Sequence, residues 1–123
     1  MGGGADARFI CGESLMLRGE VWWVDFDPSL GGEIQKMRPA VIVSNDSSNR
    51  NVNRIQVVPI TSNVSRSYPS EATITLNSEA RKAMADQIAT VSKLRVRNRV
   101  GVLSVSDMQS VETAILIQLG MKP

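Results

Sequence analysis

Two apolar runs of this chain each end in polar groups that the runs do not need in order to fold. In residues 37–45 (MRPAVIVSN) Arg38 precedes the run, and in residues 57–63 (VVPITSN) Thr61 follows it together with a serine and an asparagine. A guanidinium is a planar fork of donors that matches a phosphate, and a threonine hydroxyl adds one more donor. If the two runs are neighbouring strands of one sheet, Arg38 and Thr61 would meet at an anion-binding site.

The composition restricts what such a site can do. The chain contains no histidine and only one cysteine, Cys11. It therefore lacks the imidazole of a Ser-His-Asp or Cys-His mechanism and the ligands of a Cys/His metal site. Acid–base steps must come from carboxylates, arginine, lysine, tyrosine or the substrate itself, and we expect no metal and no cofactor.

The sequence also bears on location. No stretch approaches the ~18 consecutive apolar residues that a membrane span needs, and the first fifteen residues lack the continuous apolar segment of a secretory signal. A single cysteine cannot form an internal disulfide, which fits a reducing compartment. We expect a cytoplasmic protein without a membrane partner.

Positive charge is concentrated in the middle of the chain. Residues 36–99 hold eleven bases and four acids, a local net charge of +7, whereas the whole chain carries +2. A basic segment favours a polyanion partner, because phosphate neutralisation releases counterions. A solvated face without a partner is the alternative, and charge alone does not decide between them.

Short strands dominate the predicted elements. Aromatic and β-branched residues predict a first strand at 21–26, and a polar stretch at 46–51 predicts a short helical turn. Further strands are predicted at 40–45, 55–61, 72–76, 87–92 and 99–103. The length of 123 residues fits one domain, which we place at 16–123. Residues 1–15 contain a glycine triplet and no periodicity, and we interpret them as a flexible leader or a cloning remnant.

The last element is predicted to be a helix. Ser106 and Gln109 fit a capping box, and Gly120 fits the position after the helix end. An apolar stripe is formed by Met108, Val111, Ile115 and Leu119. Short antiparallel strands with one terminal helix indicate a mainly β protein with a small, strongly curved sheet or a partly open barrel. Pairing two copies would cover the open sheet edges.

These segments resemble the MazF/PemK family of toxin endoribonucleases. The run 18–28 (RGEVWWVDFDP) resembles its opening strand, and 31–44 (GGEIQKMRPAVIVS) resembles its G-S-E-x-x-x-x-R-P-x-x-V/I-V segment. Residues 58–62 (VPITS) resemble the strand with the family threonine, and Tyr68-Pro69 and 86–88 (DQI) match two further signatures. The similarity extends from about Met16 to the C-terminus, although the residues before Met16 do not fit the family pattern.

The resemblance implies a fold, an activity and partners. The fold would be an SH3-like small barrel of the CcdB/MazF type with a C-terminal helix, assembled as a homodimer. The activity would be metal-independent, sequence-specific cleavage of single-stranded RNA, which leaves a 2′,3′-cyclic phosphate and a 5′-hydroxyl. The protein would be the toxin of a type II toxin–antitoxin system, and the acidic C-terminal tail of its cognate antitoxin would occupy the RNA groove.

The resemblance also assigns catalytic roles. Arg38 corresponds to the catalytic arginine, where it would stabilise the charge of the transition state; a structural salt bridge at a strand start is the alternative. Thr61 corresponds to the active-site threonine, although a β-branched residue also suits a strand end for structural reasons alone. Glu33 is the candidate for removing the 2′-hydroxyl proton, with an exposed loop glutamate as its alternative.

Further residues are predicted to contact RNA. Four fall where family members contact RNA, and their side chains can read base edges (Ser62, Asn63, Asp86 and Gln87). Three basic residues are interpreted as phosphate contacts, with solvated charge as the alternative (Lys36, Arg66 and Arg97). Arg97 belongs to a run with Lys93, Arg95 and Arg99, whose alternation would place all four on one face of a strand. The segments 34–36 and 78–84 are expected to vary with the target sequence.

Two other classes of function remain open. Gyrase-poisoning toxins of the CcdB type share the implied fold and cut nothing, and a binding-only barrel would also account for the basic segment. The combination of Arg38, Thr61 and Glu33 favours RNA cleavage, because a gyrase-binding protein does not need it.

Overall fold

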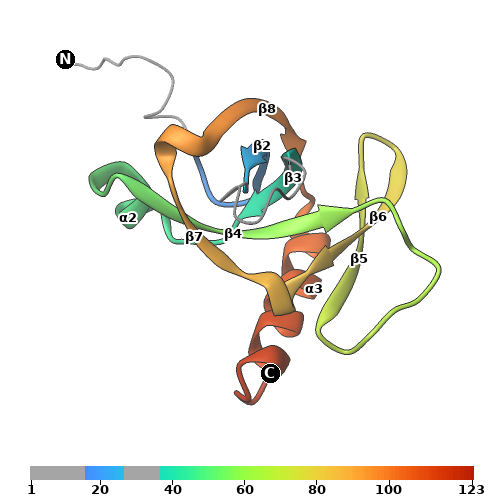
Figure 1. The fold of residues 1–123 in the computed structure, drawn as a ribbon. Helices are drawn as coiled ribbons and strands as arrows, with labels where there is room; N and C mark the ends of the chain where they lie inside the picture. The colour runs from blue at the N-terminus through green and yellow to red at the C-terminus, as the bar shows by residue number, and fades with distance from the viewer. Residues whose placement is uncertain (1–15, 27–36) are drawn as a thin grey trace, which may run out of the picture.

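The computed structural model describes residues 16–26 and 37–123. The predicted leader at 1–15 and two predicted site residues, Glu33 and Lys36, lie outside the described residues. Figure 1 shows a strongly bent sheet with one long helix lying against it.

The described elements are mostly short strands. In chain order they are β2 (Glu20–Asp25), β3 (Met37–Ile42), α2 (Asp46–Asn51), β4 (Arg54–Thr61), β5 (Glu71–Leu76), β6 (Glu79–Met84), the 3₁₀ turn η3 (Ala85–Gln87), β7 (Ala89–Ser92), the 3₁₀ turn η4 (Lys93–Arg95), β8 (Val96–Val102) and α3 (Val105–Gln118). The sheet has the order β5-β6-β4-β3-β2-β8, with β7 added on β4, and all of its pairs are antiparallel. The predicted mainly β fold with a C-terminal helix is confirmed.

Strand β4 lies at the centre of this sheet and is buried on both faces. Val58 and Ile60 pack into a cluster with β5, β6 and α3, whereas Ile55 and Val57 pack into a second cluster with Val24, Val91 and neighbours on β3. Because both faces are covered, the sequence of the strand is a nearly continuous apolar run and does not alternate between apolar and polar residues. Each fully buried Val or Ile contributes roughly 1.5–3 kcal/mol through the hydrophobic effect.

The strand predictions differ from the structure at several places. The strand predicted at 40–45 is β3 at 37–42. No strand was predicted at β6 (79–84), because Glu79, Arg81 and Lys82 obscure its pattern. Strand β7 begins at Ala89, since residues 85–87 form η3. Two bases of the predicted alternating run, Lys93 and Arg95, lie in η4, so only Arg97 and Arg99 are on a strand, and the β2–β8 pairing there contains two register shifts.

Helix α3 begins two residues earlier than predicted. Its N-cap is Ser104, whose Oγ accepts a hydrogen bond of 3.0 Å from the Asp107 N–H, and not Ser106. The start of the helix is fixed by the point at which the chain leaves the sheet. Leu103, the residue before Ser104, still donates its N–H to the Gly19 carbonyl. Neither helix in residues 16–26 and 37–123 is long and apolar enough to span a membrane.

The C-terminal end of α3 follows the prediction in part. Gly120 has φ 74°. Its N–H is bonded to the Ile117 carbonyl and that of Met121 to the Leu116 carbonyl, the arrangement of a Schellman motif. Leu119, however, is 56% exposed, because the helix buries Ala114 beside Met108 and Val111. The apolar stripe is thus shorter than its spacing indicated.

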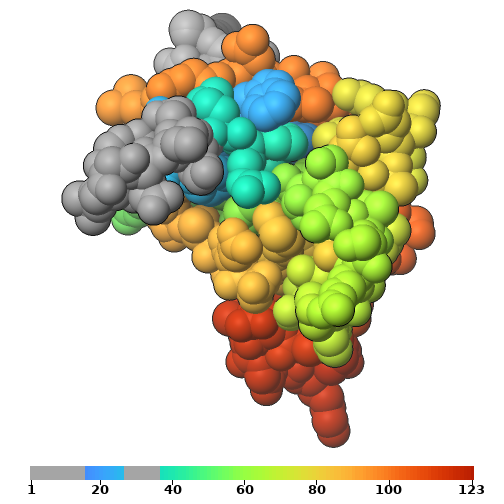
Figure 2. Space-filling model, turned by 45° about the vertical axis from the view of Figure 1, so that its right-hand side comes forward, coloured from blue at the N-terminus to red at the C-terminus, as the bar shows by residue number. Residues whose placement is uncertain are grey.

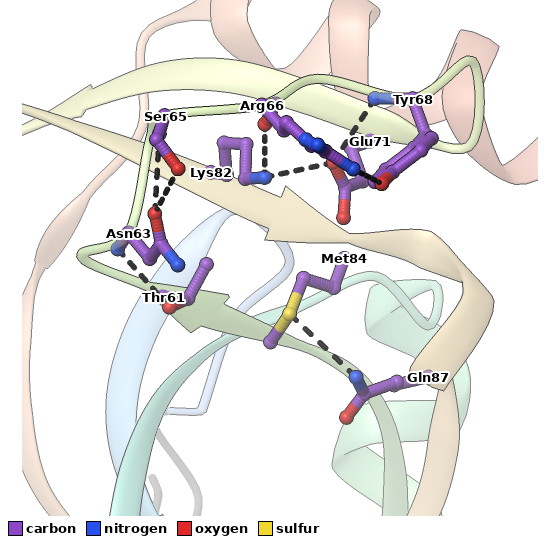
Figure 3. A network of polar contacts seen from close by, with 9 residues as sticks. All are labelled: Thr61, Asn63, Ser65, Arg66, Tyr68, Glu71, Lys82, Met84 and Gln87. Carbon is purple, nitrogen blue, oxygen red and sulfur yellow. Dashed lines mark hydrogen bonds and ion pairs between the residues drawn. The ribbon is translucent and has the colours of Figure 1, made fainter.

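A buried ion pair fastens the loop between β4 and β5 to the sheet. Lys82 is only 6% exposed. Its Nζ lies 2.9 Å from Glu71 Oε1 and also donates to the Arg66 carbonyl, while Glu71 Oε1 accepts the Tyr68 N–H at 3.1 Å (Figure 3). The hydrogen bond from Lys82 holds the pKa of the Glu71 carboxyl below its ordinary value. This pair therefore keeps residues 62–70 over the outer face of β6.

Substitution of Glu71 tests this contribution. Glu71→Gln leaves the buried Lys82 ammonium without its carboxylate, so the free energy of unfolding at pH 7 should fall by about 1–3 kcal/mol. Because the folded-state pKa of Glu71 is lowered, its contribution is complete above the ordinary value of 4.5 and is lost as the pH falls through the folded-state pKa. Urea unfolding curves of wild type and variant should thus converge as the pH is lowered progressively below 4.5. Glu112→Gln is the matched control. Glu112 pairs with Arg18 at a half-exposed position, where an ion pair contributes little to the free energy of unfolding. Equal stability of Glu71→Gln and wild type at pH 7 would contradict the argument.

Candidate active site

The register of β3 and β4 determines which polar residues meet. The recorded pairs are Ala40 with Pro59, Val41 with Val58, and Ile42 with Val57. The recorded ladder ends there, and the same register extended by two residues would align Arg38 with Thr61. Directly opposed residues in an antiparallel pair project from the same face of the sheet, so both side chains reach the same end of the two strands.

An open pocket of about 530 Å³ lies at this end of the strands. Three segments form it: Met37, Arg38 and Pro39 from β3; Ile60, Thr61 and Ser62 from the end of β4; and Leu76, Asn77, Glu79 and Arg81 from the β5–β6 hairpin, with Trp23 and Val100 completing the lining. Figure 2 shows the face on which β3, the end of β4 and the hairpin come together. Arg38 and Thr61 therefore belong to one site, as the sequence predicted.

Arg38 is half-buried at the pocket wall. Among the residues that the structure describes, no carboxylate forms an ion pair with it. A structural salt bridge within those residues therefore does not account for it. Its fork of N–H donors is free to meet an anion in the pocket.

Thr61 is held in place by the loop that follows it. Its Oγ1 accepts a hydrogen bond of 3.2 Å from the Asn63 N–H, and Asn63 Oδ1 in turn accepts the N–H and the hydroxyl of Ser65 at 3.1 and 2.8 Å (Figure 3). This hydrogen bond uses a lone pair of the Thr61 oxygen, so the hydroxyl hydrogen remains available to donate. The site thus presents a cation and a hydroxyl donor side by side.

The residues predicted to contact RNA bases are spread over a wider surface. Ser62 lines the pocket, whereas Asn63 lies just beyond it in the loop. Asp86 and Gln87 are exposed in η3, where Gln87 Nε2 lies 3.6 Å from Met84 Sδ (Figure 3). The structure therefore brings one of these four into the pocket with Arg38.

Two of the predicted phosphate contacts, Arg66 and Arg97, have internal partners. Arg66 Nη1 donates to the Tyr68 hydroxyl at 3.1 Å. Arg97 Nη2 lies 3.5 Å from Asp25 Oδ2, and its Nη1 donates to the Leu94 carbonyl at 2.6 Å. The neighbouring Arg99 pairs with Glu20 at 3.3 Å. Carboxylates of β2 therefore neutralise part of the basic run on β8.

Several lining residues of the pocket were not predicted from the sequence. Trp23 is 40% exposed there, and Asn77, Glu79 and Arg81 come from a hairpin that was not predicted. A signal for the hairpin was present, since Asn77 and Ser78 form a two-residue connection with φ 51° and 70°, as a type I′ turn requires. Among residues 16–26 and 37–123, no three Cys, His, Asp or Glu side chains lie close enough together to hold a metal ion.

The chain is similar to proteins of one family along nearly its whole length. A model of the family described as PemK-like, MazF-like toxin of type II toxin-antitoxin system matches residues 17–119. The protein named Endoribonuclease MazF9 of Mycobacterium tuberculosis is 34% identical over 116 residues, which cover 87% of this chain and 98% of that protein. The Endoribonuclease toxin MazF of Escherichia coli is 30% identical over 103 residues, 83% of this chain and 92% of its own length.

A solved structure agrees with this similarity. It holds an endoribonuclease from a mycobacterial species in complex with its cognate antitoxin, and it superposes on this chain with a TM-score of 0.74 at 25% identity, covering 87% of this chain and 97% of that one. The curved sheet and the C-terminal helix are thus shared. From the family match and these relatives, the chain belongs to the PemK-like, MazF-like toxins of type II toxin–antitoxin systems.

Proposed function

We propose that this chain is a toxin that cuts single-stranded RNA, and messenger RNA in particular, at specific short sequences without a metal ion. The observation that carries the proposal is that Arg38 and Thr61 line one open pocket, where Arg38 has no carboxylate partner among the described residues. The names of the relatives as endoribonucleases support it. A gyrase-binding toxin would have no use for this pair.

The reaction requires little from the protein beyond charge and position. The ribose 2′-oxygen attacks the adjacent phosphorus and loses its proton, the bond from phosphorus to the 5′-oxygen breaks, and that oxygen takes up a proton. The products are a 2′,3′-cyclic phosphate and a 5′-hydroxyl. Arg38 and the Thr61 hydroxyl bind the non-bridging oxygens, whose negative charge grows in the transition state. We assign the base that accepts the 2′-proton to Glu33, which burial by bound RNA would have to make more basic.

The surrounding residues are proposed to hold the RNA strand. Amide, hydroxyl and carboxylate groups can read the edges of unstacked bases, and basic side chains bind phosphates. We assign base contacts to Ser62, Asn63, Asp86 and Gln87, and phosphate contacts to Lys36, Arg66 and Arg97. Arg97 would have to exchange its ion pair with Asp25 for a phosphate.

The proposal includes two protein partners and a location. A cognate antitoxin with an acidic tail fits the same basic surface as RNA, and the antitoxin complex of the mycobacterial relative supports this partner. A homodimer is supported by large apolar side chains that remain exposed on β8 and α3, namely Val102, Val105, Ile117 and Leu119. We place the protein in the cytoplasm, where messenger RNA is available.

Removal of the arginine should abolish cleavage. Arg38→Ala leaves the growing charge on the phosphate without its cation, which should lower the cleavage rate at least about 100-fold. The rate is measured by mapping new 5′ ends on a long, unstructured RNA, and thermal unfolding checks that the variant is folded. Arg54→Ala is the matched control, because Arg54 is an exposed arginine of the neighbouring strand whose described contact is only to Asn53. Unchanged cleavage by folded Arg38→Ala would rule out this site.

Substitutions of Thr61 separate the hydroxyl from the shape of the side chain. Thr61→Val keeps the branched shape but loses the donor, so the rate should fall roughly 10- to 100-fold. Thr61→Ser keeps the hydroxyl and should retain most of the activity. Single-turnover rates on one defined oligonucleotide give the comparison. Equal rates for the valine and serine variants would show that the hydroxyl takes no part.

The attacking group can be tested on the substrate. Replacement of the scissile ribose by 2′-deoxyribose removes the nucleophile, so cleavage should cease while binding persists. Addition of EDTA should leave the rate on the all-ribose substrate unchanged. Cleavage of the deoxy substrate, or loss of activity in EDTA, would require a water nucleophile or a metal instead.

A further inference from the structure

An ion pair lies on the wall of the pocket formed by the β5–β6 hairpin. Glu79 and Arg81 form an ion pair on β6, and both line the pocket. In the β5–β6 register, Arg81 lies opposite Ile74 and Glu79 opposite Leu76, so the two charged side chains share a face with buried apolar residues. This apolar face opens into the pocket near the tip of the hairpin. The charges therefore project into the site and not away from the molecule.

The pairing of β4 with β6 brings Arg81 close to Thr61. Thr61 is paired with Lys82, and Arg81 is the preceding residue of β6. Successive residues of a strand point to opposite faces, so Lys82 is covered by the loop at 62–70 while Arg81 lines the pocket. The Arg81 side chain thus projects from the face opposite to that of Thr61 and Lys82, and Arg81 lines the same pocket as Arg38 from a different strand.

The partner of Arg81 does not hold it firmly. The Glu79 side chain is 65% exposed, whereas that of Arg81 is 29% exposed. Exposed pairs of this kind contribute little to stability, because water screens the charges. The described contacts of the guanidinium are to Glu79 and, at 2.9 Å, to the Ala80 carbonyl, both within two residues on the same strand. Several of its five donors remain available for an anion.

We propose that Arg81 binds a second phosphate of the RNA strand, next to the phosphate at Arg38 and Thr61, and that Glu79 competes with this phosphate for Arg81. This inference rests on the proposed function of the pocket and adds a substrate-positioning residue to it. One arginine acts on the reacting phosphate, and the other fixes the path of the strand across the pocket. Glu79 weakens RNA binding, both because it occupies Arg81 and because it repels phosphate.

Two substitutions distinguish this role from a structural ion pair. Both Arg81→Ala and Glu79→Gln break the pair, so a structural role predicts the same direction of change for both. The proposal predicts opposite directions. Arg81→Ala should raise KM roughly 5- to 10-fold with kcat within about 2-fold, and Glu79→Gln should lower KM roughly 2- to 5-fold.

Binding at several salt concentrations gives a second readout. The probe is the long, unstructured RNA, followed by a short oligonucleotide around a mapped cut with 2′-deoxyribose at the scissile position. For Arg81→Ala, the slope of log K against log salt should be shallower by about 0.7, the value for one lost phosphate contact on a single strand. Arg18→Ala and Glu112→Gln are the matched controls, because they break an ion pair of similar exposure outside the pocket. They should leave KM and the salt slope unchanged.

The outcomes separate this inference from the proposed function. Equal KM shifts for Arg81→Ala and Glu79→Gln, or an unchanged salt slope for folded Arg81→Ala, would overturn the role of Arg81 while leaving wild-type cleavage intact. If the wild type binds RNA but does not cut it, the proposed catalysis fails and the binding comparison still decides the role of Arg81. A wild type that neither binds nor cuts RNA would overturn both.

Discussion

The hydrogen-bonded register between β3 and β4 is the constraint on which the site depends. A slip of one residue would turn Arg38 to the opposite face from Thr61 and would expose one of the two apolar clusters that flank the sheet. Burial on both faces of β4 prevents such a slip, because Val57 and Val58 belong to different clusters on opposite faces of the strand. Each of these side chains can be buried only when it faces its own cluster. The packing that stabilises the fold therefore also aligns the chemistry, although no core residue carries a reactive group.

The same strand connects the site with the surfaces around it. β4 pairs with β3, β6 and β7, so the arginine of β3, the threonine at the end of β4 and the charged pair of β6 occupy fixed positions relative to one another. The Lys82–Glu71 pair then ties the loop after Thr61 to the back of β6. Rigid strands thus position the groups assigned to the reacting phosphate, while an anchored loop carries groups assigned to the bases.

Local patterns in the sequence were sufficient for some of these features. The apolar runs around Arg38 and Thr61 predicted two strands, and Gly120 predicted the end of α3, because strand burial and helix ends leave signals within a few residues. Strand β6 was missed because its apolar face ends in Glu79 and Arg81, which line a pocket, so the alternation that marks a strand is absent there. Ser104 was passed over in favour of Ser106, since both suit an N-cap and only the path of Leu103 out of the sheet decides between them. The partners of Arg97 and Arg99 are residues of β2 more than seventy positions away, and no local pattern reports them.

The composition of the pocket has a consequence for protein synthesis. Its lining begins at Trp23 and ends at Val100, so residues from four-fifths of the way along the chain complete a site that starts near the beginning. Contacts over such separations form late, after the loop-closure entropy of the intervening chain has been overcome. A chain still attached to the ribosome therefore has no assembled pocket until β8 has emerged and paired with β2. For a protein whose proposed substrate is the same class of molecule as its own template, the topology delays activity until translation of that template has passed β8.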